Sequence, residues 1–407
     1  MTTVTAALRT LDEAVRLNDP HFHTYEAAEV FARLRREDPV HHHTPLDTWV
    51  LSRYDDVRHA SRHPEDFSVA HGIRLDNAAG QPPASGMFAD GGEFLAYTDP
   101  PRHTELRKVL APAFTARAVA AREARIRDIA VSVVDRVEPG AVVDWVPLAA
   151  RMPILVMLDL LGLPATDVDD VRRWSDGMER LSYPLRPGEL QEVYAQFAPL
   201  GDYLREQMRR KRAHPGDDLT SLLVAPRDGG TVVTEANVVT FLQTVLGAGN
   251  DTTRSLLSGM VVELARRPDQ LAALRADPGL VDRAVEEALR WITPARGFVR
   301  TVVRPTEIRG VALRPGQRVY LAYDSANRDE EVFADPDVFD VTVPRRQHAS
   351  FGFGTHVCIG AAYARKEAAA LLSALLRRFT TFELAGEPER VVAVLREGYL
   401  GAPVVFR

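Results

Sequence analysis

The stretch that constrains the fold of this chain most is residues 351–360, Phe-Gly-Phe-Gly-Thr-His-Val-Cys-Ile-Gly, which holds the only cysteine among 407 residues. Two glycines precede Cys358, a third follows it, and a helix-forming run begins directly afterwards. A thiolate at the N-terminal end of a helix is stabilised by the helix dipole and by free backbone N–H groups. Glycines lack Cβ and let the backbone approach a large flat ligand closely. A lone cysteine is usually a buried packing residue, but the glycine frame favours Cys358 as an anionic ligand.

Composition narrows the class of protein. Hydrophobic residues make up 45% of the chain, and the net charge of −6 comes from interspersed acids and bases, which argues against a nucleic-acid-binding protein. A single cysteine excludes a disulfide framework. Residues 1–5 lack the basic and apolar pattern of a signal peptide. The most apolar segment, 154–163, is interrupted by Asp159 and is shorter than the roughly 20 residues that span a bilayer. We therefore expect a cytoplasmic protein without a membrane anchor.

Hydrophobic periodicity predicts a chain that is mostly helical. The expected helices are 24–36, 55–62, 118–137, 152–161, 167–181, 189–213, 234–266, 284–290 and 361–379. The expected strands are 40–43, 49–52, 308–313 and 319–322, with more strands near the C-terminus. Residues 70–96, rich in Gly, Ala and Pro, are predicted as a long surface loop, and loops of that length are often functional. No repeat and no shift in composition divides the chain, so the prediction is one domain over 1–407, mainly α with a small β region.

Three neighbouring histidines, His41, His42 and His43, raise the question of a metal site. Neighbours along a strand point to opposite faces, and no cluster of carboxylates or cysteines is nearby. We therefore favour a structural role for them.

The longest predicted helix, 234–266, contains Gly247-Ala248-Gly249-Asn250-Asp251-Thr252-Thr253 near its middle. Glycine in a helix interior costs up to about 1 kcal/mol relative to alanine. A sequence that accepts such a cost usually does so for function. The alternative is a packing notch for a crossing helix.

A second candidate lies in Asp99-Pro100-Pro101-Arg102-His103-Thr104-Glu105-Leu106-Arg107. His103 and Arg107 are four residues apart and share one helix face. Two donors on one face suit the edge of a dianionic ligand. The alternative is a solvated basic helix, because Arg102 and Lys108 flank the pair.

The pattern Phe-Gly-x-Gly-x-His-x-Cys-x-Gly resembles the haem-binding loop of the cytochrome P-450 family, with matches at Phe351, Gly352, Gly354, His356, Cys358 and Gly360. The resemblance implies heme b with Cys358 as the axial iron ligand. It also implies the P-450 fold, in which the haem lies between a long central helix and the helix after the cysteine loop.

Further matches extend the resemblance along the chain. It implies that His103, Arg107, Arg300 and His356 hold the haem propionates, and that Ala248 and Gly249 leave a groove for dioxygen. Asp251 and Thr252 match the acid and alcohol that deliver protons. Residues implied for the substrate pocket are Thr244, Ala248, Ala295 and Phe298. Arg296 either turns away from the pocket, towards a propionate or solvent, or pairs with a substrate carboxylate, and we favour the first.

Glu287 and Arg290 match the family's Glu-x-x-Arg pair, which is structural. The third member of that set is usually a basic residue before the haem loop. The aligned position is Val343, with Arg345 and Arg346 two and three residues later, so the third partner stays open.

The resemblance implies a haem-thiolate monooxygenase that hydroxylates or epoxidises a bulky apolar compound, such as a terpenoid, a steroid or a macrolide-like ring system. Because the chain has no Gly-x-Gly-x-x-Gly loop, its two electrons are expected from a separate ferredoxin and ferredoxin reductase, with the enzyme itself a monomer. Two alternatives are a peroxygenase, which usually lacks the acid-alcohol pair, and a haem-thiolate sensor, which has no need of one. An acidic partner could be attracted by basic residues around the cysteine side, namely Arg102, Lys108, Arg365 and Lys366.

Overall fold

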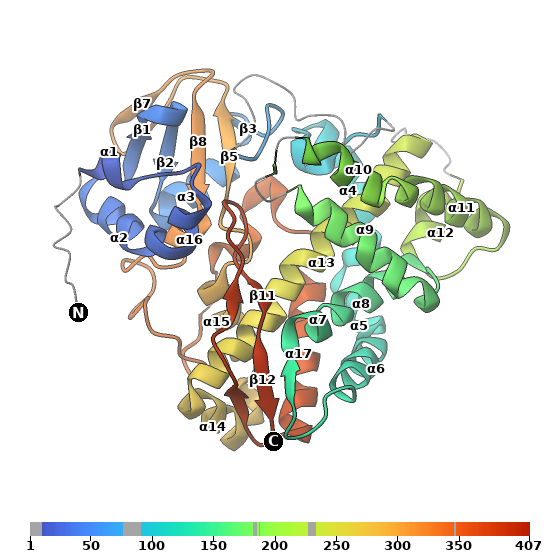
Figure 1. Cartoon of the computed structure of the whole chain (residues 1–407). Helices are drawn as coiled ribbons and strands as arrows, with labels where there is room; N and C mark the ends of the chain where they lie inside the picture. Colours follow the sequence, from blue (N-terminus) through green and yellow to red (C-terminus); the bar gives the residue numbers. More distant parts are fainter. Residues whose placement is uncertain (1–9, 76–90, 182–184, 187, 227–232, 346) are drawn as a thin grey trace.

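The computed structural model describes residues 10–75, 91–181, 185–186, 188–226, 233–345 and 347–407. A large helical part and a smaller β part lie side by side (Figure 1). The predicted mainly helical fold with small sheets is confirmed. The loop prediction for 70–96 lies largely outside the described residues, as does Arg346.

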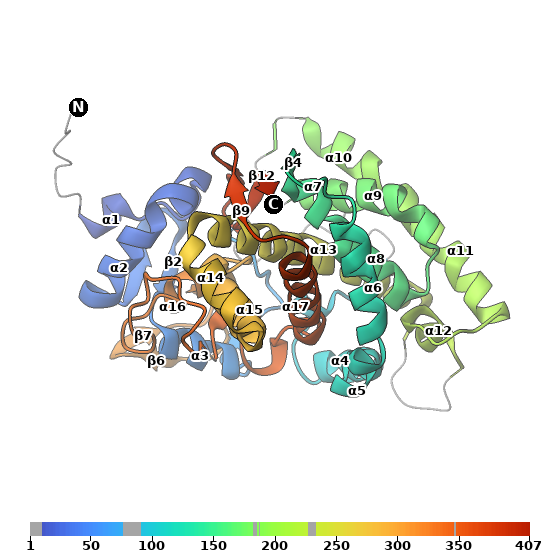
Figure 2. The same cartoon turned by 90° about the horizontal axis from the view of Figure 1, so that it is seen from below.

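Helix α13, Glu235–Arg266, is the axis of the helical part and runs through the middle of the molecule in both views (Figures 1 and 2). Its 32 residues, at about 1.5 Å each, give a rod of about 48 Å. The helix begins at a capping box, in which the Thr234 and Asn237 side chains each bond to the backbone N–H of the other. It packs against helices from distant parts of the chain, namely α8 (Arg151–Leu161), α9 (Val168–Arg180), α15 (Val281–Ile292) and α17 (Ala361–Arg378).

The remaining helices surround this bundle. They are α1 (Leu11–Ala14), α2 (Ala27–Glu37), α3 (Tyr54–Arg62), α4 (Arg102–Leu110), α5 (Ala116–Ala121), α6 (Glu123–Val134), α7 (Trp145–Ala149), α10 (Glu189–Phe197), α11 (Pro199–Ala213), α12 (Leu219–Val224), α14 (Pro268–Ala276) and α16 (Tyr323–Ala326). None of the helices among the described residues combines the length and apolar character needed to cross a bilayer.

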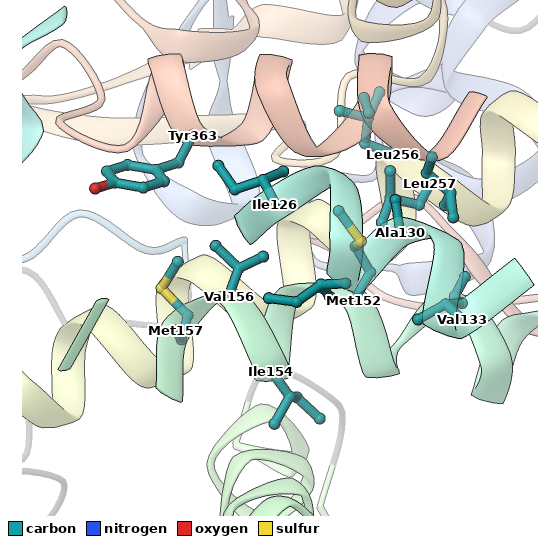
Figure 3. Packing of buried hydrophobic residues seen from close by; sticks show 14 of the residues in the cluster. Ile126, Ala130, Val133, Met152, Ile154, Val156, Met157, Leu256, Leu257 and Tyr363 are labelled. Carbon is teal, nitrogen blue, oxygen red and sulfur yellow. The ribbon is translucent and has the colours of Figure 1, made fainter. Parts of the chain in front are cut away.

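A hydrophobic cluster fixes one side of α13 (Figure 3). Ile126 and Ala130 of α6, Met152 and Val156 of α8, and Leu257 of α13 are all buried in it. Each fully buried aliphatic side chain of this size contributes about 1.5–3 kcal/mol relative to exposure. This packing fixes α13 against α6 and α8, and Leu256 of the same cluster borders the cavity described below.

The β part is a five-stranded sheet in the order β1-β2-β8-β5-β3. Its strands are β1 (Val40–His43), β2 (Thr48–Leu51), β8 (Arg318–Ala322), β5 (Gly297–Val302) and β3 (Phe67–Ser68). The predicted strand pair is confirmed as an antiparallel pairing in which Val40 faces Leu51. Smaller sheets are β4-β12-β9 (Val142–Asp144, Pro403–Phe406, Phe382–Leu384), β10-β11 (Glu389–Arg390, Tyr399–Gly401) and β6-β7 (Thr306–Ile308, Val311–Leu313).

Two of the three neighbouring histidines have a side-chain partner close by in the sequence. The His41 ring bonds to Asp38 at 2.8 Å and the His42 ring bonds to Asp47 at 2.9 Å. Across the described residues, no group of three or more His, Cys, Asp or Glu side chains is arranged to hold a metal ion.

Several predicted elements are divided in the structure. The helix expected at 24–36 begins as a π-helix, Phe22–Glu26, before α2 continues it. The helix expected at 189–213 is α10 followed by α11, because Pro199 has no N–H to continue the hydrogen-bond ladder. The strand expected at 308–313 is wrong as one element, since Arg309 and Gly310 both adopt positive φ and turn the chain between β6 and β7.

Candidate active site

A cavity of about 320 Å³ lies between α13 and the cysteine loop. It gathers most of the residues that the sequence analysis singled out, which come from four separate parts of the chain. Those that line it are His103, Arg107, Thr244, Ala248, Gly249, Thr252, Ala295, Phe298, Arg300, Phe351, Gly352, His356, Cys358 and Gly360. Asp251, Glu287 and Arg290 do not line it.

The cysteine loop has the geometry that its glycines predict. Gly352 and Gly354 have φ of 66° and 67°, and a Cβ at Gly354 would lie 2.4 Å from the Ser61 carbonyl oxygen. The backbone N–H of Cys358 donates to the Phe351 carbonyl at 2.8 Å, which closes the loop before α17. The thiol faces the open cavity and is exposed there, although protein surrounds it closely on the other sides.

Two opposing effects act on the pKa of Cys358, and the larger of them raises it. Burial raises the pKa of the thiol, while the backbone N–H groups of Gly360 and Ala361 and the charge of Arg107 act to lower it. These groups at the start of α17 stabilise a thiolate once a cation lies above it.

Four nitrogen-bearing side chains meet at the rim of the cavity. The rings of His103 and His356 lie 4.2 Å apart, and their Nδ1 and Nε2 atoms respectively are buried without a hydrogen-bond partner. Burial lowers the pKa of His103 to about 4 and that of His356 to about 3. Among the described residues, no carboxylate forms an ion pair with Arg107 or Arg300, and Arg300 donates only to the Val299 carbonyl. Buried polar groups normally have partners, so this cluster fits a ligand that brings two carboxylates of its own, as haem does.

The small residues of α13 have both of the roles considered in the sequence analysis, a packing notch and a border of the cavity. A Cβ on Gly247 would lie 3.3 Å from Met178 Cε, and one on Gly249 would lie 3.0 Å from Met157 Sδ. Both glycines are therefore packing notches for crossing helices. Ala248 and Gly249 also border the cavity, so the same notch leaves open space beside Cys358.

The two hydroxyls on this wall are bonded within the helix. Thr252 Oγ1 donates to the Ala248 carbonyl at 2.8 Å, and Thr244 Oγ1 donates to the Thr240 carbonyl at 2.6 Å. Each hydroxyl oxygen keeps acceptor capacity towards the cavity.

Asp251 belongs to the same stretch of α13 but does not line the cavity. Its carboxylate is buried and forms an ion pair with Arg396, whose Nη1 is 2.8 Å from Oδ2. Burial is the main cause that raises the pKa of Asp251, and the neighbouring Glu179 raises it further. Sequence reasoning placed Asp251 next to Thr252 but gave no sign of these two partners.

The Glu287–Arg290 pair is fully buried, with Arg290 Nε 2.8 Å from Glu287 Oε2. The third partner left open by the sequence is Arg345, whose Nε lies 3.5 Å from the same oxygen. Val343, the position aligned with the family's basic residue, comes two residues before Arg345 in the chain. Arg290 also donates to backbone carbonyls that precede the cysteine loop, those of Asn327, Pro336 and Val338.

Arg296 turns away from the cavity, as favoured, but its partners are neither a propionate nor solvent. It is buried, pairs with Glu397 at 2.6 Å and donates to the His23 carbonyl. It borders a separate, more polar cavity of about 370 Å³ that contains none of the cysteine loop.

Sequence reasoning missed several residues of the site. Ile73, Leu95 and Ala96, from the segment predicted as a surface loop, line the cavity, as does Val69 just before it. Glu367 of α17 also lines it, and burial raises the pKa of this carboxyl to about 8. The only signal for Glu367 was its spacing of four residues from Tyr363, which puts both on one helix face.

Comparisons with known proteins match this geometry. The model of the family described as Cytochrome P450 matches residues 202–392. Cytochrome P450 107B1 of Saccharopolyspora erythraea is 37% identical over 388 residues, which cover 92% of this chain and 93% of that protein. The chain belongs to the cytochrome P450 family.

Two other similarities support the assignment. Linalool 8-monooxygenase of Pseudomonas putida is 35% identical and covers 96% of this P450, with 98% of its own length matched. The crystal structure of CYP108D1 from Novosphingobium aromaticivorans superposes with a TM-score of 0.84, at 29% identity and 98% coverage of both chains. The protein is thus a haem-thiolate monooxygenase of the bacterial type, and its single cysteine is consistent with the family's haem-binding cysteine.

Proposed function

We propose that this P450 hydroxylates or epoxidises a bulky, uncharged apolar compound such as a terpenoid, a steroid or a macrolide-like ring system. The observation that carries the proposal is the cavity wall above Cys358. Most of the lining is apolar, with groups such as Ala248, Ala295 and Phe298. The hydroxyls of Thr244 and Thr252, which also border it, donate to helix carbonyls. A relative that acts on linalool, by its name, supports an apolar substrate.

On this proposal, the chain over 1–407 is one catalytic domain in which each residue of the cavity has a role. Cys358 holds the haem iron, and His103, Arg107, Arg300 and His356 hold the propionates. The bound haem supplies the iron chemistry that activates dioxygen with two electrons. Ala248 and Gly249 leave room for that oxygen, while Asp251 and Thr252 pass protons towards the cavity.

Substrate-induced spin-state shifts test the pocket. We expect neutral ring compounds to bind and matched carboxylic acids to bind at least tenfold more weakly. Arg296→Ala should leave the affinity for neutral compounds unchanged in protein that retains haem, because Arg296 points into the other cavity. If only carboxylates bind, and their affinity collapses in this variant, the apolar-pocket proposal is wrong.

Electrons on this proposal come from a ferredoxin and its reductase. The basic residues near the cysteine side give little support of their own. Arg102 is paired with Glu93, Arg365 with Glu286 and Lys366 with Glu123, so most of that positive charge is neutralised locally. Turnover with a ferredoxin, its reductase and NADH, compared with turnover on hydrogen peroxide alone, decides between the monooxygenase and the peroxygenase.

A further inference from the structure

We propose that Arg396 is a positioning residue for the proton-delivering carboxylate, and that it ties Asp251 to the substrate-facing wall at Ala295. The inference rests on the proposed role of Asp251 in proton delivery. It adds a residue 145 positions away in the sequence, on the segment between β10 and β11, that acts through Asp251 and does not touch the cavity.

Arg396 holds Asp251 at two points. Its Nη1 lies 2.8 Å from the carboxylate Oδ2, and its Nη2 donates to the backbone carbonyl of the same residue at 2.9 Å. Nη2 also bonds to Ser255 Oγ at 3.0 Å, one helical turn further on. Because the guanidinium is planar and rigid, three simultaneous bonds fix the carboxylate relative to the helix axis.

Further ion pairs surround Asp251 and Arg396. Glu179 of α9 lies 3.1 Å from Arg396 Nη1 and also bonds to Arg254, which in turn is 3.8 Å from Asp251 Oδ1. Two carboxylates and two guanidinium groups thus alternate in a buried cluster. Asp176, also on α9, lies 3.4 Å from Arg254 at its outer edge. Removing Arg396 would take away the guanidinium that bonds both the carboxylate and the backbone carbonyl of Asp251, so this buried carboxylate would lose its fixed orientation.

The backbone of the same segment is hydrogen-bonded to residues of the cavity wall. Ala295 and Arg396 form an antiparallel bridge, the N–H of Arg296 donates to the Leu395 carbonyl at 2.8 Å, and the N–H of Glu397 donates to the Pro294 carbonyl at 3.2 Å. Pro294 and Ala295 line the cavity. A substrate that pushes on Ala295 therefore pushes on the residue whose side chain holds Asp251.

The segment also approaches α13 too closely to move independently of it. A Cβ on Gly398 would lie 2.6 Å from Ser255 Oγ. Contact at this point leaves room only for glycine. The segment that carries Arg396 is therefore packed directly on α13, one turn from Asp251, and bonded to the cavity wall at Ala295.

The test compares Arg396→Gln with Arg390→Gln, a matched control on the same hairpin whose guanidinium pairs with Glu397 and not with Asp251. We expect Arg396→Gln to lower the product formed per NADH at least fivefold, to raise peroxide, and to increase the solvent deuterium isotope effect. Substrate affinity from the spin-state shift should change less than twofold. Arg390→Gln should behave as the unmodified enzyme does.

A double-variant comparison separates this role from a structural one. In an Asp251→Asn background, Arg396→Gln should cause no further loss, because Arg396 acts through that carboxylate. The infrared band of the Asp251 carboxyl, read without turnover, should shift in Arg396→Gln. Additive losses, or unchanged coupling in Arg396→Gln while Asp251→Asn is impaired, would overturn the inference. No effect of Asp251→Asn itself would overturn the proposed proton delivery, and the inference with it. If Arg396→Gln retains no haem, Arg396→Lys, which keeps the charge and loses the fork, is judged by the same criteria.

Discussion

Glu367→Gln should make the protein more stable, by a margin that grows with pH. The Glu367 carboxyl is 1% exposed, its Oε2 has no hydrogen-bond partner among the described residues, and burial raises its pKa from 4.5 to about 8. The folded protein therefore keeps this group protonated where the unfolded chain has released the proton. Below pH 4.5 the raised pKa of Glu367 therefore costs the folded protein nothing. As the pH rises from 4.5 towards about 8, the free energy of unfolding falls.

The magnitude follows from this shift. Each pH unit between the two pKa values costs about 1.4 kcal/mol, so the penalty at pH 7 is about 3 kcal/mol. The amide of glutamine has the same shape and no charge to lose, so the variant should escape this penalty.

Urea unfolding followed by circular dichroism at pH 5, 6, 7 and 8 measures the difference. The free energies of unfolding of the two proteins should nearly agree at pH 5 and diverge steadily up to pH 8. Glu383→Gln, at an exposed residue that pairs with Arg407, is the control and should show no such divergence. Parallel curves for Glu367→Gln and the unmodified protein would refute the reasoning.

Three further predictions concern other parts of the site. Replacing His103 by Phe together with Arg107 by Gln removes two charge-assisted bonds of about 1.5–3 kcal/mol each, so haem should transfer to an acceptor protein at least a hundredfold faster; an unchanged rate would contradict the propionate assignment. Arg345→Gln should lower the free energy of unfolding by about 3–5 kcal/mol, because it breaks a buried ion pair, whereas Val343→Ala should cost less than about 1 kcal/mol; equal effects would count against Arg345 as third partner. Thr252→Ala should keep substrate binding and NADH consumption while product falls and peroxide rises, and an equal loss of all four would indicate misfolding instead.

The features that the sequence predicted well are those written in local patterns. The cysteine loop needs two positive-φ glycines, Gly352 and Gly354, in a fixed spacing around one cysteine. The helix at 235–266 begins at a capping box and ends just before Pro268. In both cases the residues that decide the structure are close in sequence, so spacing alone identified them.

The features that the sequence did not predict depend on contacts between distant segments. Asp251 is held by Arg396, and nothing in the local pattern of either residue indicates the other. Arg345, two residues nearer the cysteine loop than Val343, meets Glu287, and the irregular chain before that loop has no periodicity from which this spacing could be predicted. The loop residues Leu95 and Ala96 became cavity wall through tertiary packing, which overrides the tendency of Gly- and Pro-rich segments to lie on the surface.

The central claim is that Cys358 binds the haem iron as a thiolate. The most direct test is the absorption spectrum of the reduced, carbon monoxide-bound protein, compared with that of Cys358→Ala. The unmodified protein should show the red-shifted Soret band of thiolate-bound haem, and the variant should lack it even where it retains haem through His103, Arg107, Arg300 and His356. A variant that keeps the red-shifted band would contradict the assignment.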